Sequence, residues 1–257
     1  MPSHFSTLGM AVDSEEELVQ LAEAVGPHAH PVPFAGGTYF HWHDPSGAEL
    51  WLQVNADNEF AGVTPHFAGQ SRVVVRLAHR VRPADAGPFD GGFYAWADPA
   101  GESDDTDTAD VQGVYPMVVD SPEFARLAPL DLPVTVPIQI AAFAHEVECF
   151  DTEADFDASQ SAEGPRMAAE SFIPSGLFHP DGGATSLPEA RVIMNGRVLS
   201  AERRTNAFTK QPFVTALVQT VGGTYDAVID VSLLDRAPKV GGVLSGSFWL
   251  SGRVVID

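Results

Sequence analysis

The sequence predicts an α+β protein that is predominantly β, with a duplicated N-terminal domain and a β-barrel-like C-terminal region. Three observations lead to this fold class. One capped amphipathic helix lies near the N-terminus, several motifs recur between residues 35 and 150, and β-rich segments with glycine turns follow residue 190. At 257 residues, the chain is long enough for one large β domain or two smaller ones.

The predicted helix covers residues 14–26. Ser14 and Glu17 have the spacing of a capping box, and acidic residues fill the first turn, where the helix dipole favours negative charge. An apolar stripe follows at i, i+3, i+4 and i+7, formed by Leu18, Leu21, Ala22 and Val25. Gly26-Pro27 is a typical helix end. Residues 5–12, before the helix, are predicted to form a strand.

After the helix the pattern changes to strands and tight turns. Segments rich in β-branched and aromatic residues predict strands at 33–43, 48–54 and 71–81. Asp44-Pro45-Ser46-Gly47 is a strong turn signal between the first two of these strands.

Motifs of the first part of the chain recur in the same order further on, which indicates a tandem duplication. Trp-x-Asp-Pro-x-Gly at 42–47 recurs at 96–101, Glu-Phe-Ala at 59–61 recurs at 123–125, and Ala-His-x-Val at 78–81 recurs at 144–147. The sequence therefore predicts one domain over 1–150, with repeats at about 1–82 and 83–150. The second repeat is expected to lack the helix, because residues 82–92 are few and rich in Pro and Gly.

Residues 151–189 are predicted to be an acidic linker or loop, since 151–170 holds few large apolar residues. The last region, 190–257, is predicted to be a β-rich domain with a hairpin turn at 220–225. Its strands are expected at 191–194, 213–221, 225–233 and 243–256. Two interpretations stay open: a small antiparallel barrel of the oligonucleotide/oligosaccharide-binding (OB) type, or extra strands on the first domain.

Composition restricts the partners. The chain has 35 acidic and 14 basic residues and a net charge of −21. Nucleic acids and anionic membranes are bound largely through Lys and Arg, so neither is expected as a partner. The partners that remain possible are a small-molecule ligand and a second copy of the chain. We expect a cytoplasmic protein, because no stretch approaches the roughly 20 apolar residues of a membrane span and no signal peptide is recognisable.

The segment His41-Trp42-His43 is the most suggestive for chemistry. Alternate residues of a strand point to the same side, so the two imidazoles would project together, as in metal sites built on β-sheets. The predicted ligands of a divalent metal are His41, His43 and Glu49, with His66 or His79 as other candidates for the third position. In the alternative interpretation, both rings face solvent or a cavity while Trp42 fills the core.

His79 and His145 occupy equivalent positions in the two repeats. They are candidates for ligand binding, or for anchors that bond a neighbouring backbone carbonyl. Cys149 is the single cysteine, which excludes an intrachain disulfide. Acidic residues near it in sequence are expected to raise the pKa of its thiol and make it a poor nucleophile.

The order strand, capped helix, strand, Asp-Pro-Ser-Gly turn and strand over residues 4–120 resembles one βαβββ module of the vicinal oxygen chelate superfamily. That superfamily includes glyoxalases and bleomycin-resistance proteins, and its members are built from paired modules. The resemblance implies metal-binding histidines near His4 and His79. Trp51 stands where the superfamily's glutamate would follow the turn, so the implied metal site is expected to be absent or altered.

No nucleophile elbow, phosphate-binding loop or dinucleotide-binding motif occurs in the sequence. We therefore expect a non-enzymatic binding or assembly protein. The alternative is a metal-dependent enzyme of the vicinal oxygen chelate type with a modified site around His41 and His43.

Overall fold

The computed structural model describes residues 3–82, 86–98, 113–161, 164, 166–177 and 187–255. In this part of the chain the protein is mostly β, with 50% strand, two α-helices and two sheets. The predominance of β structure expected from the sequence is confirmed.

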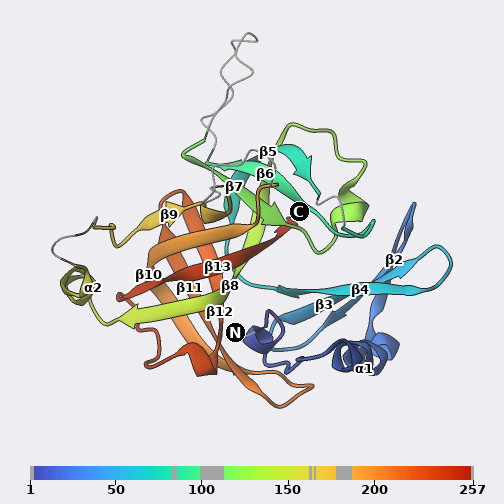
Figure 1. Ribbon diagram of the computed structural model, residues 1–257, viewed down its shortest axis with the longest axis horizontal. Coiled ribbons are helices and arrows are strands. Elements are labelled where there is room, and N and C mark those ends of the chain that lie inside the picture. Colours follow the sequence, from blue (N-terminus) through green and yellow to red (C-terminus); the bar gives the residue numbers. More distant parts are fainter. Residues whose placement is uncertain are drawn as a thin grey trace, which may run out of the picture.

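The smaller sheet is antiparallel and has four strands in the order β1-β2-β3-β4. Its strands are β1 (His30–Phe34), β2 (Gly37–His43), β3 (Ala48–Asn55) and β4 (Phe60–Phe67). Helix α1 (Glu15–Val25) lies beneath this sheet in Figure 1.

The larger sheet is mixed and has nine strands in the described chain. They are β5 (Val73–Val81), β6 (Gly92–Ala97), β7 (Tyr115–Asp120), β8 (Val134–Phe150), β9 (Ser171–Ile173), β10 (Arg191–Thr205), β11 (Pro212–Thr220), β12 (Gly223–Asp230) and β13 (Val243–Val254). The strand order is β11-β12-β8-β5-β6-β7-β13-β10-β9, and two further pairings, β10 with β11 and β8 with β13, close the sheet into a ring.

The long strands β8 and β13 are shared by two closed circuits of strand pairing. One circuit runs through β8, β12, β11, β10 and β13, and the other through β8, β5, β6, β7 and β13. The link from β7 to β13 is a single pair, Asp120 with Ser251. β8 and β13 therefore form the central wall of the larger sheet (Figure 1).

The two faces of β8 belong to different cores. Ile140, Ala142 and Ala144 pack inside the ring with residues of β5–β7 and β10–β13. Ala141 and Phe143 point to the outside of the ring, where they pack with α1 and the apolar side of the four-stranded sheet. Because both faces are covered, the middle of β8 is buried throughout, and its residues there are apolar except for Gln139.

The predicted helix is confirmed. Ser14 is its N-cap and accepts a hydrogen bond from the backbone N–H of Glu17, while the Glu17 carboxylate accepts one from the N–H of Asp13. Ala22 and Val25 are buried, as the apolar stripe predicts. Gly26 keeps a right-handed conformation, so the chain continues as a short 3₁₀ turn at Gly26–His28 before it turns into β1.

The strand predicted for residues 5–12 is wrong, because Ser6–Leu8 forms a 3₁₀ helix. Ser3 accepts a hydrogen bond from the N–H of Ser6, and Thr7 donates one to the carbonyl of His4. Such local bonds compete with strand pairing. The chain therefore begins with a 3₁₀ turn, a helix and four strands, which departs from the βαβββ order of the vicinal oxygen chelate module.

Further segments differ from the sequence prediction, which gave no strands for β6, β7 and β8. The strand expected at 33–43 is a hairpin of β1 and β2. β4 was not predicted, since Gly62 and Pro65 interrupt its pattern, which an edge strand tolerates. The segment 151–189, predicted to be a linker or loop, contains α2 (Glu153–Ser159) and β9.

Four strands lie in the regions expected for 190–257, and the hairpin turn between β11 and β12 is confirmed. β10 is much longer than the predicted 191–194, and 231–233, predicted to end a strand, forms a 3₁₀ turn. The four strands share one sheet with β5–β8 rather than a sheet of their own. The two proposed repeats place 37–43 and 92–97, and likewise 73–81 and 134–150, in strands. Their Glu-Phe-Ala motifs differ, because the first begins β4 and the second lies in a 3₁₀ turn at Phe124–Leu127. The duplication stays a prediction.

Candidate functional site

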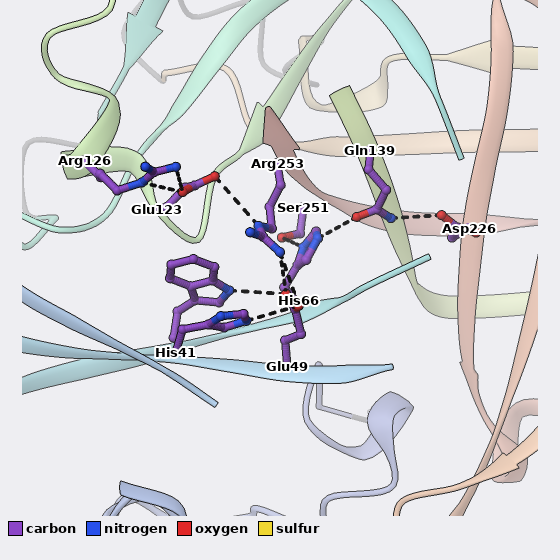
Figure 2. Close-up of polar contacts among 10 residues, drawn as sticks. His41, Glu49, His66, Glu123, Arg126, Gln139, Asp226, Ser251 and Arg253 are labelled. Atoms are coloured by element: carbon purple, nitrogen blue, oxygen red, sulfur yellow. Dashed lines mark hydrogen bonds and ion pairs between the residues drawn. The ribbon is translucent and has the colours of Figure 1, made fainter. Parts of the chain in front are cut away.

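A buried polar network joins the two sheets where β2–β4 meet β8, β12 and β13 (Figure 2). The side chains come from segments far apart in the sequence, and several are less than one-tenth exposed. They are His41, Glu49, Trp51, His66, Glu123, Arg126, Gln139, Asp226, Ser251 and Arg253.

His66 on β4 is completely buried, and both of its ring nitrogens are hydrogen-bonded. Its Nδ1 lies 2.8 Å from Ser251 Oγ and its Nε2 lies 2.8 Å from Gln139 Oε1. Because the Gln139 oxygen only accepts, Nε2 carries the proton and Nδ1 accepts from the serine hydroxyl. Burial lowers the pKa of His66 to about 4, and the nearby Glu49 opposes this effect. The ring is therefore neutral above that pH.

This chain of hydrogen bonds ends at Asp226. Gln139 Nε2 donates to Asp226 Oδ2 over 2.9 Å, and the backbone N–H groups of Gln70 and Ser71 donate to the same carboxylate. Ser251, His66, Gln139 and Asp226 thus form one continuous buried series. A serine beside a neutral histidine is the arrangement of an activated nucleophile, but Ser251 is fully buried in this packing.

Glu49 on β3 lies at the centre of a second group of contacts. Arg253 Nη1 is 3.2 Å from both carboxylate oxygens, His41 Nε2 is 3.1 Å from Oε1, and the Trp51 indole donates over 3.4 Å. Burial alone would raise the pKa of Glu49, but the contact with His41 and the charges of its neighbours hold it at about 2. Glu49 is therefore an anion whose partners compensate for its burial.

Arg253 links this group to the loop before β8. Its guanidinium lies 4.8 Å from the Trp51 ring centre, and its Nε is 3.8 Å from Glu123 Oε1, which is too long for a hydrogen bond. Glu123 is buried and pairs through Oε2 with Arg126 at 2.6 Å. Two carboxylates and two guanidiniums thus alternate between the sheets.

A backbone position next to Asp226 has no room for a side chain. A Cβ on Gly69 would lie 2.1 Å from Asp226 Oδ2, closer than non-bonded atoms approach. We expect Gly69→Ala to destabilise the protein by about 2 kcal/mol in urea denaturation, because the carboxylate must give up hydrogen bonds to move. The matched control is Gly26→Ala, whose Cβ meets nothing within 4 Å and which should leave stability nearly unchanged. Equal stability of the two variants would contradict this reading of the contact.

Asp226 also lines an open groove of about 510 Å³ on the outer face of the ring. The groove is lined by the loop that follows β4 and by parts of β10 and β11, and it presents Gln70, Ser200, Arg204 and Thr215. Two neighbouring cavities of about 390 and 270 Å³ share Glu202 with it. All three hollows are lined in part by residues 200–205 of β10, whose consecutive side chains point to opposite faces of the strand.

The histidines expected to form a metal site are only partly brought together. His41 contacts Glu49 and stacks on Trp51 at 4.2 Å between ring centres. His43 is exposed, and its ring centre is 6.0 Å from that of His41. As their side chains stand, no three His, Cys, Asp or Glu residues of the described chain are placed to hold a metal ion.

His79 and His145 lie apart from this network and from each other. His79 is exposed on β5 and stacks on Tyr94 at 4.8 Å. His145 Nε2 is 2.9 Å from Nε2 of His4, whose ring stacks on Trp249 at 4.2 Å. Burial, and next the neighbouring His145, lower the pKa of His4 to about 4, so both rings are neutral and the Nε2–H of one donates to the Nε2 of the other.

The partly buried Asp120 and the buried Cys149 have raised pKa values. Asp120 accepts a hydrogen bond from the Trp249 indole at 2.6 Å, and burial raises the pKa of Asp120 to about 6. Burial also raises the pKa of the Cys149 thiol to about 11. The direction expected for Cys149 is confirmed, although burial contributes more than its acidic neighbours.

Sequence reasoning missed Arg253, Gln139, Ser251, Asp226 and the partner of His43. His30, on β1, lies opposite His41 in the strand ladder, and its ring centre is 5.9 Å from that of His43. The register of a β1–β2 hairpin would have placed His30 opposite His41. The prediction of a single strand over 33–43 concealed this hairpin.

No family model, curated protein or solved structure matches this chain. Neither helix of the described residues has the length and hydropathy that crossing a bilayer requires.

Proposed function

We propose that the protein is a non-enzymatic binding protein and that its ligand is a small hydroxycarboxylate held in the groove beside Asp226. The observation that carries the proposal is the guanidinium of Arg204 at the wall of the groove, in a chain with only 14 basic residues. A guanidinium at the edge of a polar groove favours an anionic group of a ligand, which it can bind through charged hydrogen bonds.

The size and chemistry of the groove support a small polar ligand. Its volume of about 510 Å³ lies in the range of ligand pockets. Thr215, Ser200 and Gln70 offer hydroxyl and amide groups, while Phe67 and Leu217 supply apolar surface. Asp226 already accepts three hydrogen bonds, so it is suited to shaping the groove rather than to exchanging protons.

Arg204 is the residue expected to hold the carboxylate. It donates to the Ser46 carbonyl through Nη1 and pairs through Nη2 with Glu202, whose side chain is 65% exposed. An exposed pair of this kind contributes little, so a ligand carboxylate can replace Glu202 at low cost. Arg204 also stacks over Phe67, which fixes its position at the wall of the groove.

The arrangement of strands agrees with a binding scaffold. Five-stranded closed sheets of the OB type bind ligands on an outer strand face. The circuit of β8 and β10–β13 supports an OB-like arrangement for the C-terminal strands, with β8 supplying the fifth strand from outside residues 190–257. The groove lies on the outer face of this circuit.

The test is calorimetric titration of the protein with citrate, tartrate and gluconate, and with glucose and erythritol as uncharged probes. We expect at least one carboxylate to bind, and Arg204→Gln to weaken that binding about tenfold or more through the loss of a charged hydrogen-bond donor. Arg166→Gln, an exposed arginine remote from the groove in sequence, is the control and should bind as the wild type does. The proposal fails if no carboxylate binds, or if both variants bind equally well.

A further inference from the structure

We propose that His30, His41 and His43 form a three-histidine site for a divalent transition metal such as Zn²⁺ on the face of the β1–β2 hairpin. This site is separate from the groove beside Asp226. It would bind an ion rather than an organic anion, and it does not depend on the proposed function.

The strand register places the three histidines together. His30 and His41 are direct partners across the antiparallel ladder, so their side chains lie on the same face. His43 follows His41 by two residues and therefore points to that face as well. Ring centres are 5.9 Å apart for His30 and His43, and 6.0 Å apart for His41 and His43.

Two of the three ligands are free to reorient. His30 and His43 are exposed, and neither makes a hydrogen bond or ion pair with another described residue. Their rings lie side by side, with 22° between their planes, and do not yet converge on a common point. Rotation about their side-chain bonds costs little at the surface, whereas each bond to a metal contributes several times more.

The third ligand is fixed in advance. His41 stacks on Trp51 with 19° between the planes, and its Nε2 is 3.1 Å from the buried carboxylate of Glu49. A carboxylate at one ring nitrogen orients a metal-binding histidine and leaves the other nitrogen as the ligand atom. Here Nδ1 of His41 would bind the ion, and Glu49 would act behind it rather than as a ligand.

Residue chemistry favours Zn²⁺ or a neighbouring transition ion over Mg²⁺ or Ca²⁺. Imidazole nitrogen binds Zn²⁺, Cu²⁺ and Ni²⁺, whereas the harder ions prefer oxygen. Three histidines leave a fourth position for water, as in zinc sites with exchangeable ligands. The net charge of −21 also attracts divalent cations to the protein.

The experiment is titration of the chelator-treated protein with Zn²⁺ against a chromophoric competitor. Cobalt absorption serves as a second readout, since tetrahedral coordination intensifies the visible bands of Co²⁺. We expect one Zn²⁺ for each chain in the wild type and at least 30-fold weaker binding in His30→Ala and in His43→Ala. The matched control is His28→Ala, an exposed histidine two positions before His30, which should bind as the wild type does.

Both ligand variants replace exposed side chains, so loss of binding would not reflect unfolding. The site is refuted if the wild type takes up no stoichiometric Zn²⁺, or if either His30→Ala or His43→Ala retains wild-type affinity. Arg204→Gln should leave Zn²⁺ binding unchanged, so failure of this site and failure of the hydroxycarboxylate groove are distinguishable.

Discussion

Replacing His66 with phenylalanine is expected to lower the free energy of unfolding by about 3 kcal/mol, since it leaves two buried polar groups without partners. The Ser251 hydroxyl would lose its acceptor, and Gln139 Oε1 would lose its donor. Phenylalanine has about the volume of histidine, so the loss reports on hydrogen bonding more than on packing. Urea denaturation followed by tryptophan fluorescence measures the change.

The same substitution at exposed His28 is the matched control and should change stability by less than about 0.5 kcal/mol. Adding Ser251→Ala to His66→Phe removes the hydroxyl that the first change leaves unpaired. The double variant should therefore be less destabilised than the sum of the two single variants. Additive losses would show that Ser251 and His66 are not coupled.

Acidification from pH 7 to pH 4 is expected to cost about 4 kcal/mol of stability, mainly because the buried His66 and the partly buried His4 bind protons less readily in the folded chain than in the unfolded one. His4 and His66 each have a folded pKa of about 4 against an ordinary value of 6.5. Unfolded chains bind protons to these groups first, so their contribution is present above pH 6.5 and is lost as the pH falls through 4. Each contributes about 3 kcal/mol to the loss at pH 4.

The carboxylates modify this profile in opposite directions. Asp120 has a folded pKa of about 6 against 3.8, so its burial costs stability at neutral pH and the cost is relieved as pH falls below 6. Glu49 has a folded pKa of about 2 against 4.5, so its contribution is present above pH 4.5 and begins to decline below it. Protonation of Asp120 offsets the loss by about 2 kcal/mol at pH 4. The two histidines together cost about 6 kcal/mol, so the net loss of stability is about 4 kcal/mol.

Denaturation curves at pH 7, 6, 5 and 4 measure this dependence. In His66→Phe the loss of stability between pH 7 and 4 should fall from about 4 to about 1 kcal/mol, because the contribution of about 3 kcal/mol from His66 is gone while Asp120 still compensates. In Asp120→Asn the loss on acidification should be larger than in the wild type, since the compensating carboxyl is removed. A profile that is flat between pH 7 and 4 would contradict the protonation states assigned to His4 and His66.

Local features of the fold were predictable from the sequence, and distant ones were not. Ser14 and Glu17 identify the start of α1 because a capping box acts within one turn of chain. The hairpin between β11 and β12 follows in the same way from adjacent glycines. By contrast, the 3₁₀ turn at Ser6–Leu8 depends on hydroxyl contacts that a strand-like pattern of residues conceals.

In the candidate site, most contacts join residues that are distant in the sequence, and these were not predictable. His41 and Glu49 were both named from the sequence as metal ligands, although its spacing could not select Glu49 over other candidates, and they do contact each other across β2 and β3. Two other contacts form only after the larger sheet has assembled. In one, Arg253 donates a hydrogen bond to Glu49, and in the other, the N–H of Ser71 donates one to Asp226. Nothing in the spacing of these residues marks them, since a hydrogen bond between distant segments leaves no periodicity in the chain.

The sharing of β8 and β13 by two circuits has a consequence for how the chain acquires its structure. Ile138 pairs with Val254 and Phe150 pairs with Val243, so the central wall joins segments separated by most of the second half of the chain. During synthesis, β8 emerges from the ribosome long before its partner, with apolar residues on both faces. Assembly dominated by such distant pairing is slow and exposes the nascent chain to aggregation. Neither circuit of the larger sheet can close until β13 has been synthesised and has paired with β8, so this pairing is expected to limit the rate of folding.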